Sequence, residues 1–503
     1  MSQAQSDQFL FLQKGSLSGG ARLVSTRRER HPINRGEAAH RITPACNRVL
    51  AGLAIAGGVL LFAANSMGGT VTAVGLNNFN QATPPATLSP DVRLSAGREF
   101  SLALNSDGTV VGWGNSGEGR STPPSGLAGA LAISAGSYHS LAVKADGTIS
   151  GWGYGANGLL DIPANLQSVV SVAAGSYHSL ALQRDGTVVA WGYVGNGRAT
   201  PPSNLRDVVA IGAGRDFSVA LKSDGTVVAW GLDDQGQTDV PAGLAKVVAI
   251  SVGANHTLAL KSDGTVAAWG LNDAGQTTVP AGLANVVAIA AGEQHSLALK
   301  TDGTVQGWGD NSSNQLNVNG SDIRAIAAGG YDSLALHGTG PLITTQPHGQ
   351  TSLAGSSITL SVGATGSGLA YQWQLNGKDI AGATGSTLTL NNATRSTAGI
   401  YTVRVTSANG STISQNTVVV VRGHLRAMLP QRLPGGSMRC FFKDEFGDPI
   451  SAANLGRYQA QVSTDLQSWT PFSQPLSLQN GQIQVDDPAA PQYVHRFYRV
   501  GEQ

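Results

Sequence analysis

The sequence is poor in cysteine, in charge and in aromatic residues. Of its 503 residues, 2 are cysteine, 13% are charged and 6% are aromatic. Cys46 precedes the apolar segment described below, so the body of the chain keeps Cys440 alone. This excludes an internal disulfide and a paired-cysteine zinc site in the body, and it neither supports nor excludes export.

Basic clusters are also missing from most of the chain. Residues 1–48 hold eight basic and three acidic side chains, whereas the rest of the chain holds more acidic than basic ones. Nucleic-acid affinity depends on clustered Lys and Arg, so this balance argues against nucleic acid as a partner.

Sustained helical periodicity is absent, and glycine is abundant. The chain has 66 glycines, each of which would cost about 1 kcal/mol in a helix interior. Short valine-rich runs bounded by Asp-Gly turns are typical of β-hairpins. The sequence therefore predicts an all-β protein of several domains, because one core rarely serves so long a chain.

The N-terminus is similar to a secretion signal. Residues 1–48 form a basic leader that we expect to be disordered, and residues 49–66 open with sixteen uncharged, mostly apolar residues. Sixteen is short for a membrane span of about twenty, so a signal peptide is favoured and a retained signal anchor stays open. Either one predicts a secreted or cell-envelope protein that meets the membrane only through such an anchor.

Two signatures repeat every thirty-nine residues between positions 67 and 340. Asp-Gly-Thr followed by Trp-Gly occurs six times, and a degenerate seventh copy spans residues 68–75. The second signature, Ala-Gly-x-x-His-Ser-Leu-Ala-Leu with variations, occurs seven times, from Ala96 to Ala328. Each unit predicts three or four short strands, which make one blade of a propeller.

The array begins with the later half of a unit and ends with the earlier half. These halves complete one blade if the chain closes into a ring, which hides both sheet edges. We therefore predict a seven-bladed β-propeller over residues 67–340. An open solenoid is the alternative, but it needs capping units that are not found in this array.

These signatures resemble the repeats of the regulator of chromosome condensation propellers. The short period and the runs at 236–241 and 275–280 look most similar to bacterial members of the β-lactamase inhibitory protein II type. That resemblance implies a bacterial protein whose rim aromatic residues contact a partner protein. Eukaryotic members exchange nucleotide on a small GTPase and dock on nucleosomes, but the wedge that they use for exchange has no counterpart in these even repeats.

Residues 341–421 resemble an immunoglobulin-like β-sandwich. Trp373 would be its buried core indole, and residues 398–401 its tyrosine corner. Val362 and Val403 stand where such domains often carry a cysteine pair, so the fold would rest on apolar packing. We expect this domain to act as a spacer or as a second binding module.

The C-terminal part predicts one more module. Residues 422–440 contain Pro430 and Pro434 with paired glycines, and we expect them to be an irregular linker. Residues 441–503 resemble the small β modules that end many secreted bacterial proteins, and their role stays open.

No residue constellation predicts catalysis. His139, His178, His256 and His295 recur at one position of successive blades, so they spread around the ring, and Phe replaces them in other repeats. We interpret them as packing residues, and the repeated aspartates as caps of Asp-Gly turns. Residues 153–158 spell a dinucleotide fingerprint, but a turn follows where the fingerprint needs a helix. We expect no enzyme activity, no metal and no cofactor.

Positions that vary between otherwise similar repeats indicate the candidate binding site. The residue before each repeated His position and the residues after Trp-Gly differ from blade to blade, and symmetry places them on one rim. Tyr is favoured at recognition surfaces because it offers a large rigid ring with a polar tip. The candidate residues are Glu99, Tyr138, Tyr177, Asp216, Asn255, Gln294 and Tyr331, together with Tyr154, Tyr193, Asp233 and Asp310 after Trp-Gly. Drift of loop sequences is the alternative explanation.

Several functions stay open on this basis. The leading hypothesis is an exported, non-catalytic protein whose rim binds a protein or a surface glycan. The second is specific inhibition of a secreted enzyme. An enzyme with an axial pocket would need convergent carboxylates or histidines, and a cytoplasmic exchange factor or chromatin protein would require that the N-terminal segment does not direct export.

Overall fold

A computed structural model describes residues 69–89, 91–164, 166, 168–447, 450, 455–493 and 495–502. The expected leader at 1–48 and the expected signal segment at 49–66 lie outside the described residues. Within the described ranges, no helix is long and apolar enough to cross a membrane.

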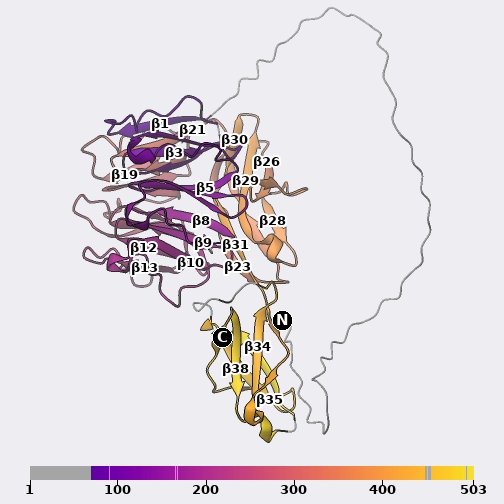
Figure 1. Ribbon diagram of the computed structural model, residues 1–503. Helices are drawn as coiled ribbons and strands as arrows, with labels where there is room; N and C mark the ends of the chain where they lie inside the picture. The colour runs from indigo at the N-terminus through magenta and orange to yellow at the C-terminus, as the bar shows by residue number, and fades with distance from the viewer. Residues whose placement is uncertain are drawn as a thin grey trace, which may run out of the picture.

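Seven three-stranded antiparallel sheets make up the first module (Figure 1). Six of them consist of three consecutive strands: β2 (Arg93–Ala96), β3 (Phe100–Leu104) and β4 (Val110–Gly114); β5 (Ala130–Ala135), β6 (His139–Lys144) and β7 (Ile149–Gly153); β8 (Val169–Ala174), β9 (His178–Gln183) and β10 (Val188–Gly192); β11 (Val208–Ala213), β12 (Phe217–Lys222) and β13 (Val227–Gly231); β14 (Val247–Val252), β15 (His256–Lys261) and β16 (Val266–Gly270); β17 (Val286–Ala291), β18 (His295–Lys300) and β19 (Val305–Gly309).

The seventh sheet joins the two ends of the array. β1 (Thr70–Gly75) pairs with β21 (Asp332–His337), which pairs with β20 (Ile323–Ala328). Backbone hydrogen bonds between the Gly turns of neighbouring sheets then run around a complete ring: Arg98 N to Gly136 O, Ser137 N to Gly175 O, Ser176 N to Gly214 O, Arg215 N to Ala254 O, Ala254 N to Gly292 O, Glu293 N to Gly329 O, and Gly330 N to Gly97 O. The predicted propeller and its clasp between the first and last strands are confirmed.

The repeated side chains hold each blade together. The Trp230 indole donates to the carbonyl of Arg198, 3.0 Å away, and Trp269 and Trp308 repeat this bond to Gln237 and Gln276. In the turns, the amide of Thr226 donates to Asp224 Oδ1, as predicted for an aspartate that caps its own turn. Packing and turn formation within each blade therefore explain why the same residues recur from repeat to repeat.

The second module contains three sheets, one of them the short β22–β25 pair, and they share one core. Its elements are β22 (Leu342–Thr345), β23 (Gln350–Leu353), β24 (Ile358–Ser361), β25 (Gly363–Thr365), β26 (Ala370–Leu375), β27 (Lys378–Asp379), β28 (Thr387–Leu390), η4 (Arg395–Thr397), β29 (Gly399–Ser407), β30 (Gly410–Ile413) and β31 (Thr417–Arg422). The β24–β28 pair packs on the sheet β23-β31-β29-β26-β27 around Trp373, which is fully buried as predicted. The Tyr401 hydroxyl donates to the carbonyl of Thr397 at 2.6 Å.

The third module begins earlier than the sequence suggested. Its strands are β32 (Leu425–Ala427), β33 (Gln431–Arg432), β34 (Met438–Asp444), β35 (Tyr458–Ser463), β36 (Thr470–Pro471), β37 (Ser477–Gln479), β38 (Gln482–Asp487) and β39 (Phe497–Glu502). Residues 422–440 were expected to be an irregular linker, but β32 and β33 both pair with β34 and belong to its sheet. Pro430 and Pro434 lie in the turns between these short strands. Because prolines and glycines are typical of loops, the sequence predicted a linker and not strands.

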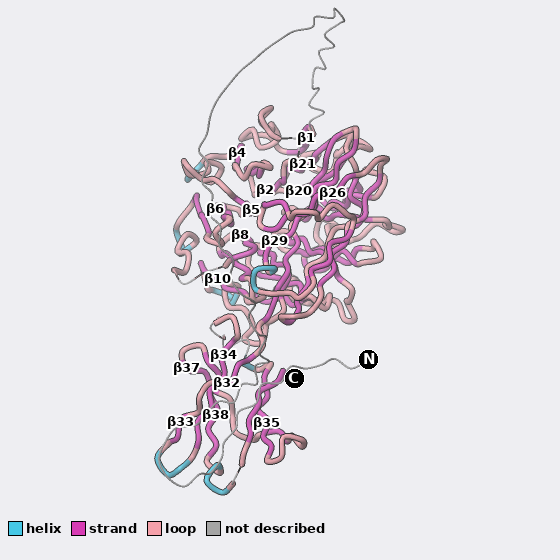
Figure 2. Tube along the Cα trace, turned by 90° about the vertical axis from the view of Figure 1, so that its right-hand side faces the viewer, coloured by secondary structure: helices cyan, strands magenta, loops and turns pink. Residues whose placement is uncertain are grey.

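The second module lies across one face of the propeller (Figures 1 and 2). Ile400, Val418 and Val420 of β29 and β31 pack with Leu131 and Val170, which lie near the start of inner strands β5 and β8. The Gly turns with the candidate rim residues follow the ends of those inner strands. The second module therefore covers the face opposite the rim.

Candidate functional site

The fold brings all the predicted rim residues to one edge of the propeller. In blade after blade, the carbonyl of the residue before the His position accepts a hydrogen bond from the backbone just after Trp-Gly. Tyr154 N donates to Tyr138 O at 2.9 Å, and Tyr193 N donates to Tyr177 O at 2.8 Å. The same bond joins Asn115 to Glu99, Leu232 to Asp216, Leu271 to Asn255, Asp310 to Gln294, and Leu76 to Tyr331. Asp233 follows Leu232 directly and is exposed on the same loop.

The tyrosines of two neighbouring blades form one aromatic cluster. The ring of Tyr138 lies 5.7 Å from that of Tyr177 and 6.2 Å from that of Tyr154, measured between centroids. Tyr154 and Tyr193 are among the large apolar side chains that are exposed in the described residues, at 37% and 49%. We call Tyr138, Tyr154, Tyr177 and Tyr193 the tyrosine cluster.

Two arginines that the sequence analysis did not single out hold this cluster. The guanidinium of Arg120 lies 5.4 Å from the Tyr138 ring, and that of Arg198 lies 4.9 Å from Tyr193 and 5.9 Å from Tyr177. Arg198 is 3% exposed and forms an ion pair with Asp216. The repeat carried a signal for Arg198, because Gln237 and Gln276 occupy the equivalent position one and two blades further along the chain.

Three of the other predicted rim residues come from blades outside the tyrosine cluster. Asn255 and Gln294 come from the fifth and sixth blades and are half-buried. Tyr331, from the closing blade, lies near Arg98 and Glu293, and partial burial together with the Glu293 charge raises the pKa of its phenol. The rim is therefore asymmetric, with its aromatic surface on the second and third blades.

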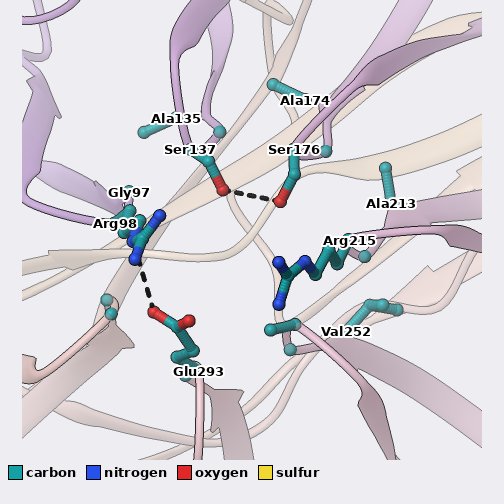
Figure 3. Close-up of a pocket in the computed structure, with 18 of the residues that line it drawn as sticks. Gly97, Arg98, Ala135, Ser137, Ala174, Ser176, Ala213, Arg215, Val252 and Glu293 are labelled. Carbon is teal, nitrogen blue, oxygen red and sulfur yellow. Dashed lines mark hydrogen bonds and ion pairs between the residues drawn. The ribbon is translucent and has the colours of Figure 1, made fainter. Parts of the chain in front are cut away.

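A small cavity of about 110 Å³ opens at the propeller axis on the same face (Figure 3). The residue directly after each Gly turn lines it, a position that the sequence analysis passed over. Arg98 pairs with Glu293 at 3.6 Å and donates to the Tyr138 hydroxyl at 3.1 Å. Ser137 and Ser176 share a hydrogen bond of 2.7 Å between their hydroxyls.

The axial cavity lacks an acid–base pair among the described residues. Glu293 is the single carboxylate in its lining, and Arg98 and Arg215 are the charged groups that face it. The convergent carboxylates or histidines that an axial active site would need do not meet in this lining. No group of three His, Cys, Asp or Glu side chains in the described ranges could hold a metal ion.

The repeated histidines are structural. Each of the four is fully buried, and its Nε2 lies 2.8–3.0 Å from a serine hydroxyl of the next blade. Ser296 donates its proton to Gln276 O, so the bond between His256 and Ser296 is donated by the imidazole. Burial lowers the pKa of His178 and His256 to about 3. Their interpretation as packing residues with a satisfied hydrogen bond is confirmed.

The dinucleotide-like run at 153–158 ends in a single 3-10 turn, η2 (Ala156–Gly158). Asn157 in this turn has a φ of 59°, in the left-handed region, so the backbone turns instead of starting a helix. The structural context that a dinucleotide fingerprint requires is therefore missing at this position.

Comparison with known proteins supports the repeat assignment. The Regulator of chromosome condensation (RCC1) repeat matches six segments, at residues 92–120, 131–159, 169–198, 208–237, 247–276 and 286–315. No curated protein sequence matches the chain. Among solved structures, Prp20p of Saccharomyces cerevisiae, described with its binding properties to Gsp1p and histones, is 19% identical over 54% of this chain and 91% of its own, with a TM-score of 0.45.

Two further structures, from a receptor kinase and from a titin complex, are similar to parts of this chain. The ectodomain of the receptor kinase CR4 of Physcomitrella patens is 21% identical over 47% of this chain and 68% of its own, with a TM-score of 0.39. The complex of titin M10 with the obscurin-like 1 Ig domain is 23% identical over 17% of this chain and 95% of its own, with a TM-score of 0.16. The propeller of this protein carries six repeats of the regulator of chromosome condensation type.

Proposed function

We propose that the chain is an exported, non-catalytic binding protein that recognises a partner protein through the tyrosine cluster on its open propeller face. The observation that carries this proposal is the asymmetry of the two faces. The second module covers one face, and the tyrosine cluster with its arginines lies on the other.

The composition of this surface favours a protein over a glycan. Tyr and Arg are the residues that most often carry binding energy at protein interfaces, because a rigid ring or a guanidinium gains much contact area for little lost entropy. Here Val194, next to Tyr193, is 67% exposed and extends the apolar area. A surface glycan is the alternative ligand of the same rim.

Specific inhibition of a secreted enzyme is the second candidate function. Arg120 and Arg198 hold three of the tyrosines, and Tyr154 packs on the ring of Tyr138, which favours a preorganised surface that loses little entropy on binding. This favours a tight complex with one enzyme. A role in nucleotide exchange or on chromatin has less support, because the repeats carry no insertion and the chain outside its leader is slightly acidic.

We further propose that residues 341–421 are an immunoglobulin-like domain. The buried Trp373 and the bond from the Tyr401 hydroxyl to Thr397 O are features of that fold. Because this domain packs against the propeller, its proposed role is to support the ring and to close the far face, and a separating spacer would not need that contact.

Affinity capture with the full chain tests the rim proposal. Secreted and envelope proteins are passed over wild type, over Tyr138→Ala/Tyr177→Ala, and over the matched control Asn255→Ala/Gln294→Ala from the non-aromatic blades. We expect a partner that the wild type and the control retain and that the tyrosine variant loses. If all three proteins retain the partner equally, the binding site lies outside the tyrosine cluster. If the wild type retains a glycan and no protein, the ligand is a glycan. Inhibition would appear as lost activity of a captured enzyme.

Export is tested on the protein isolated from cells and from their culture medium. N-terminal sequencing of the protein from culture medium and envelope fractions should place its first residue after the apolar segment at 49–64. A chain that stays in the cytoplasm with its leader intact would contradict the export proposal.

A further inference from the structure

A larger cavity lies on the covered face, between the propeller and the second module. Its volume is about 300 Å³, and both modules contribute to its wall. The apolar part of the lining includes Leu131, Ile133 and Val172 from the propeller and Ile343 from β22. Cavities of this size at domain boundaries are where proteins commonly hold small ligands.

One cation in this lining has no counter-charge. Arg93, the first residue of β2, lies deep between the modules and keeps accessible surface because it faces the cavity. Its guanidinium donates to Asn416 Oδ1, and the Asn416 amide is itself held by a bond to Leu131 O at 2.9 Å. Within the described part of the chain, no carboxylate lies at ion-pair distance from Arg93. Burial alone lowers its pKa to about 10.

The other charged groups around the cavity each lie near an opposite charge. Asp91 accepts a bond of 2.7 Å from Ser411 and lies 3.8 Å from Arg404. Arg324 donates to Gly340 O at 3.0 Å; burial lowers its pKa, and the negative charge of Asp322 opposes that shift. Burial acts on Arg93 without such an opposing charge. A buried charge that lacks an opposite charge is destabilising, and an anion in the cavity would compensate it.

We propose that this cavity binds an amphipathic organic monoanion, a carboxylate with a short hydrocarbon tail. The carboxylate would pair with the Arg93 guanidinium, which offers a planar fork of donors suited to it. The tail would lie along Leu131, Ile133, Val172 and Ile343. This site is separate from the rim, so either proposal can fail without the other.

Octanoate is the probe, with octanamide as the neutral analogue and inorganic phosphate as the anion without a tail. Titration calorimetry on the full chain should show saturable octanoate binding and much weaker binding of both analogues. Arg93→Gln should weaken octanoate binding by about tenfold or more, because a charge-assisted hydrogen bond is lost. Arg93→Lys should keep part of the affinity. Arg426→Gln, which changes an exposed arginine of the third module, should match wild type.

Thermal unfolding keeps the proposal testable if a variant is unstable. Octanoate should raise the Tm of wild type and leave the Tm of Arg93→Gln unchanged. Absence of saturable octanoate binding to wild type, or equal binding to Arg93→Gln, would overturn the proposal. Equal affinity for phosphate and octanoate would also overturn it, since the apolar wall would then contribute nothing.

Discussion

At the scale of single residues, the closing blade differs from all the others at the His position of the repeat. Four blades place an imidazole there that bonds to a serine of the next blade, and two place a phenylalanine, whereas the closing blade has Asp332. Asp332 is fully buried, and neither of its carboxylate oxygens nor the Ser101 hydroxyl of the next blade has a partner among the described residues. Burial raises the pKa of Asp332 to about 8.

Asp332→His should therefore stabilise the protein. The imidazole would give Ser101 the bond that the four repeated histidines make to their serines, with a gain of about 1–3 kcal/mol from satisfying a buried group. The folded chain holds the Asp332 proton up to about pH 8, whereas the unfolded chain releases it near pH 4, so the wild type loses stability over that range. The gain in Tm should thus be larger at pH 8 than at pH 5. Asp332→Asn should remove the pH-dependent part alone, and equal gains at both pH values would contradict this account.

The repeated histidines predict the opposite pH dependence. His178 stays neutral in the folded chain down to about pH 3, but the unfolded chain takes up a proton below about pH 6.5. Stability should therefore be complete above pH 6.5 and fall as the pH drops toward 3. His178→Phe should lower the Tm at pH 7 by the equivalent of about 1 kcal/mol, for the lost bond to Ser218, and flatten the acid slope. Parallel Tm curves for wild type and variant between pH 4 and 7 would refute this explanation.

At the scale of elements, the seventh blade depends on a strand from the other end of the array. β1 covers the edge of β21 from Thr70 opposite His337 to Gly75 opposite Asp332. Without β1, the edge of β21 would be exposed and the closing blade would keep two strands, although Gly330 N still bonds to Gly97 O of the first blade.

Deleting residues 70–75 should lower the Tm more than any rim substitution and should raise hydrogen exchange in β20 and β21 first. Hydrogen-exchange mass spectrometry on wild type and on the deletion variant measures this directly. The control is Tyr138→Ala/Tyr177→Ala, which leaves the blade intact. Unchanged protection of β21 would mean that the clasp does not hold the ring.

The sequence predicted the elements that the repeat defines and missed those that depend on a single copy. The repeated Asp-Gly and Trp-Gly signature, with six full copies, predicts the strand order, because each blade must pack the same way. Arg198 and Asp332 depart from the repeat, so their partners became visible only when neighbouring blades were placed together. β32 and β33 were missed because strands of two or three residues between prolines carry too little pattern.

At the scale of the whole molecule, the contact between the two modules was not predicted, although β31 carries a trace of it. Its four valines are all buried, with Val419 and Val421 in the core of the second module and Val418 and Val420 against the propeller. A strand that is apolar on both faces is covered on both faces. The valine run therefore indicates that both faces of β31 are covered. It does not indicate which face of the propeller covers one of them.

Val420→Asp should separate the folding of the two modules without unfolding either. Val420 is fully buried in the cluster that joins β31 to the propeller, and its side chain does not belong to the core around Trp373. A buried, unpaired carboxylate at this contact costs several kcal/mol, which is comparable to what a modest apolar interface supplies. Calorimetry should then show two transitions where the wild type shows one, and octanoate should no longer bind, because the cavity needs both modules. Val419→Asp, which points into the core of the second module, is the contrasting change and should unfold that module outright. A single transition at a slightly lower Tm for Val420→Asp would mean that the modules stay joined by their polar contacts, with the valines of β31 adding little.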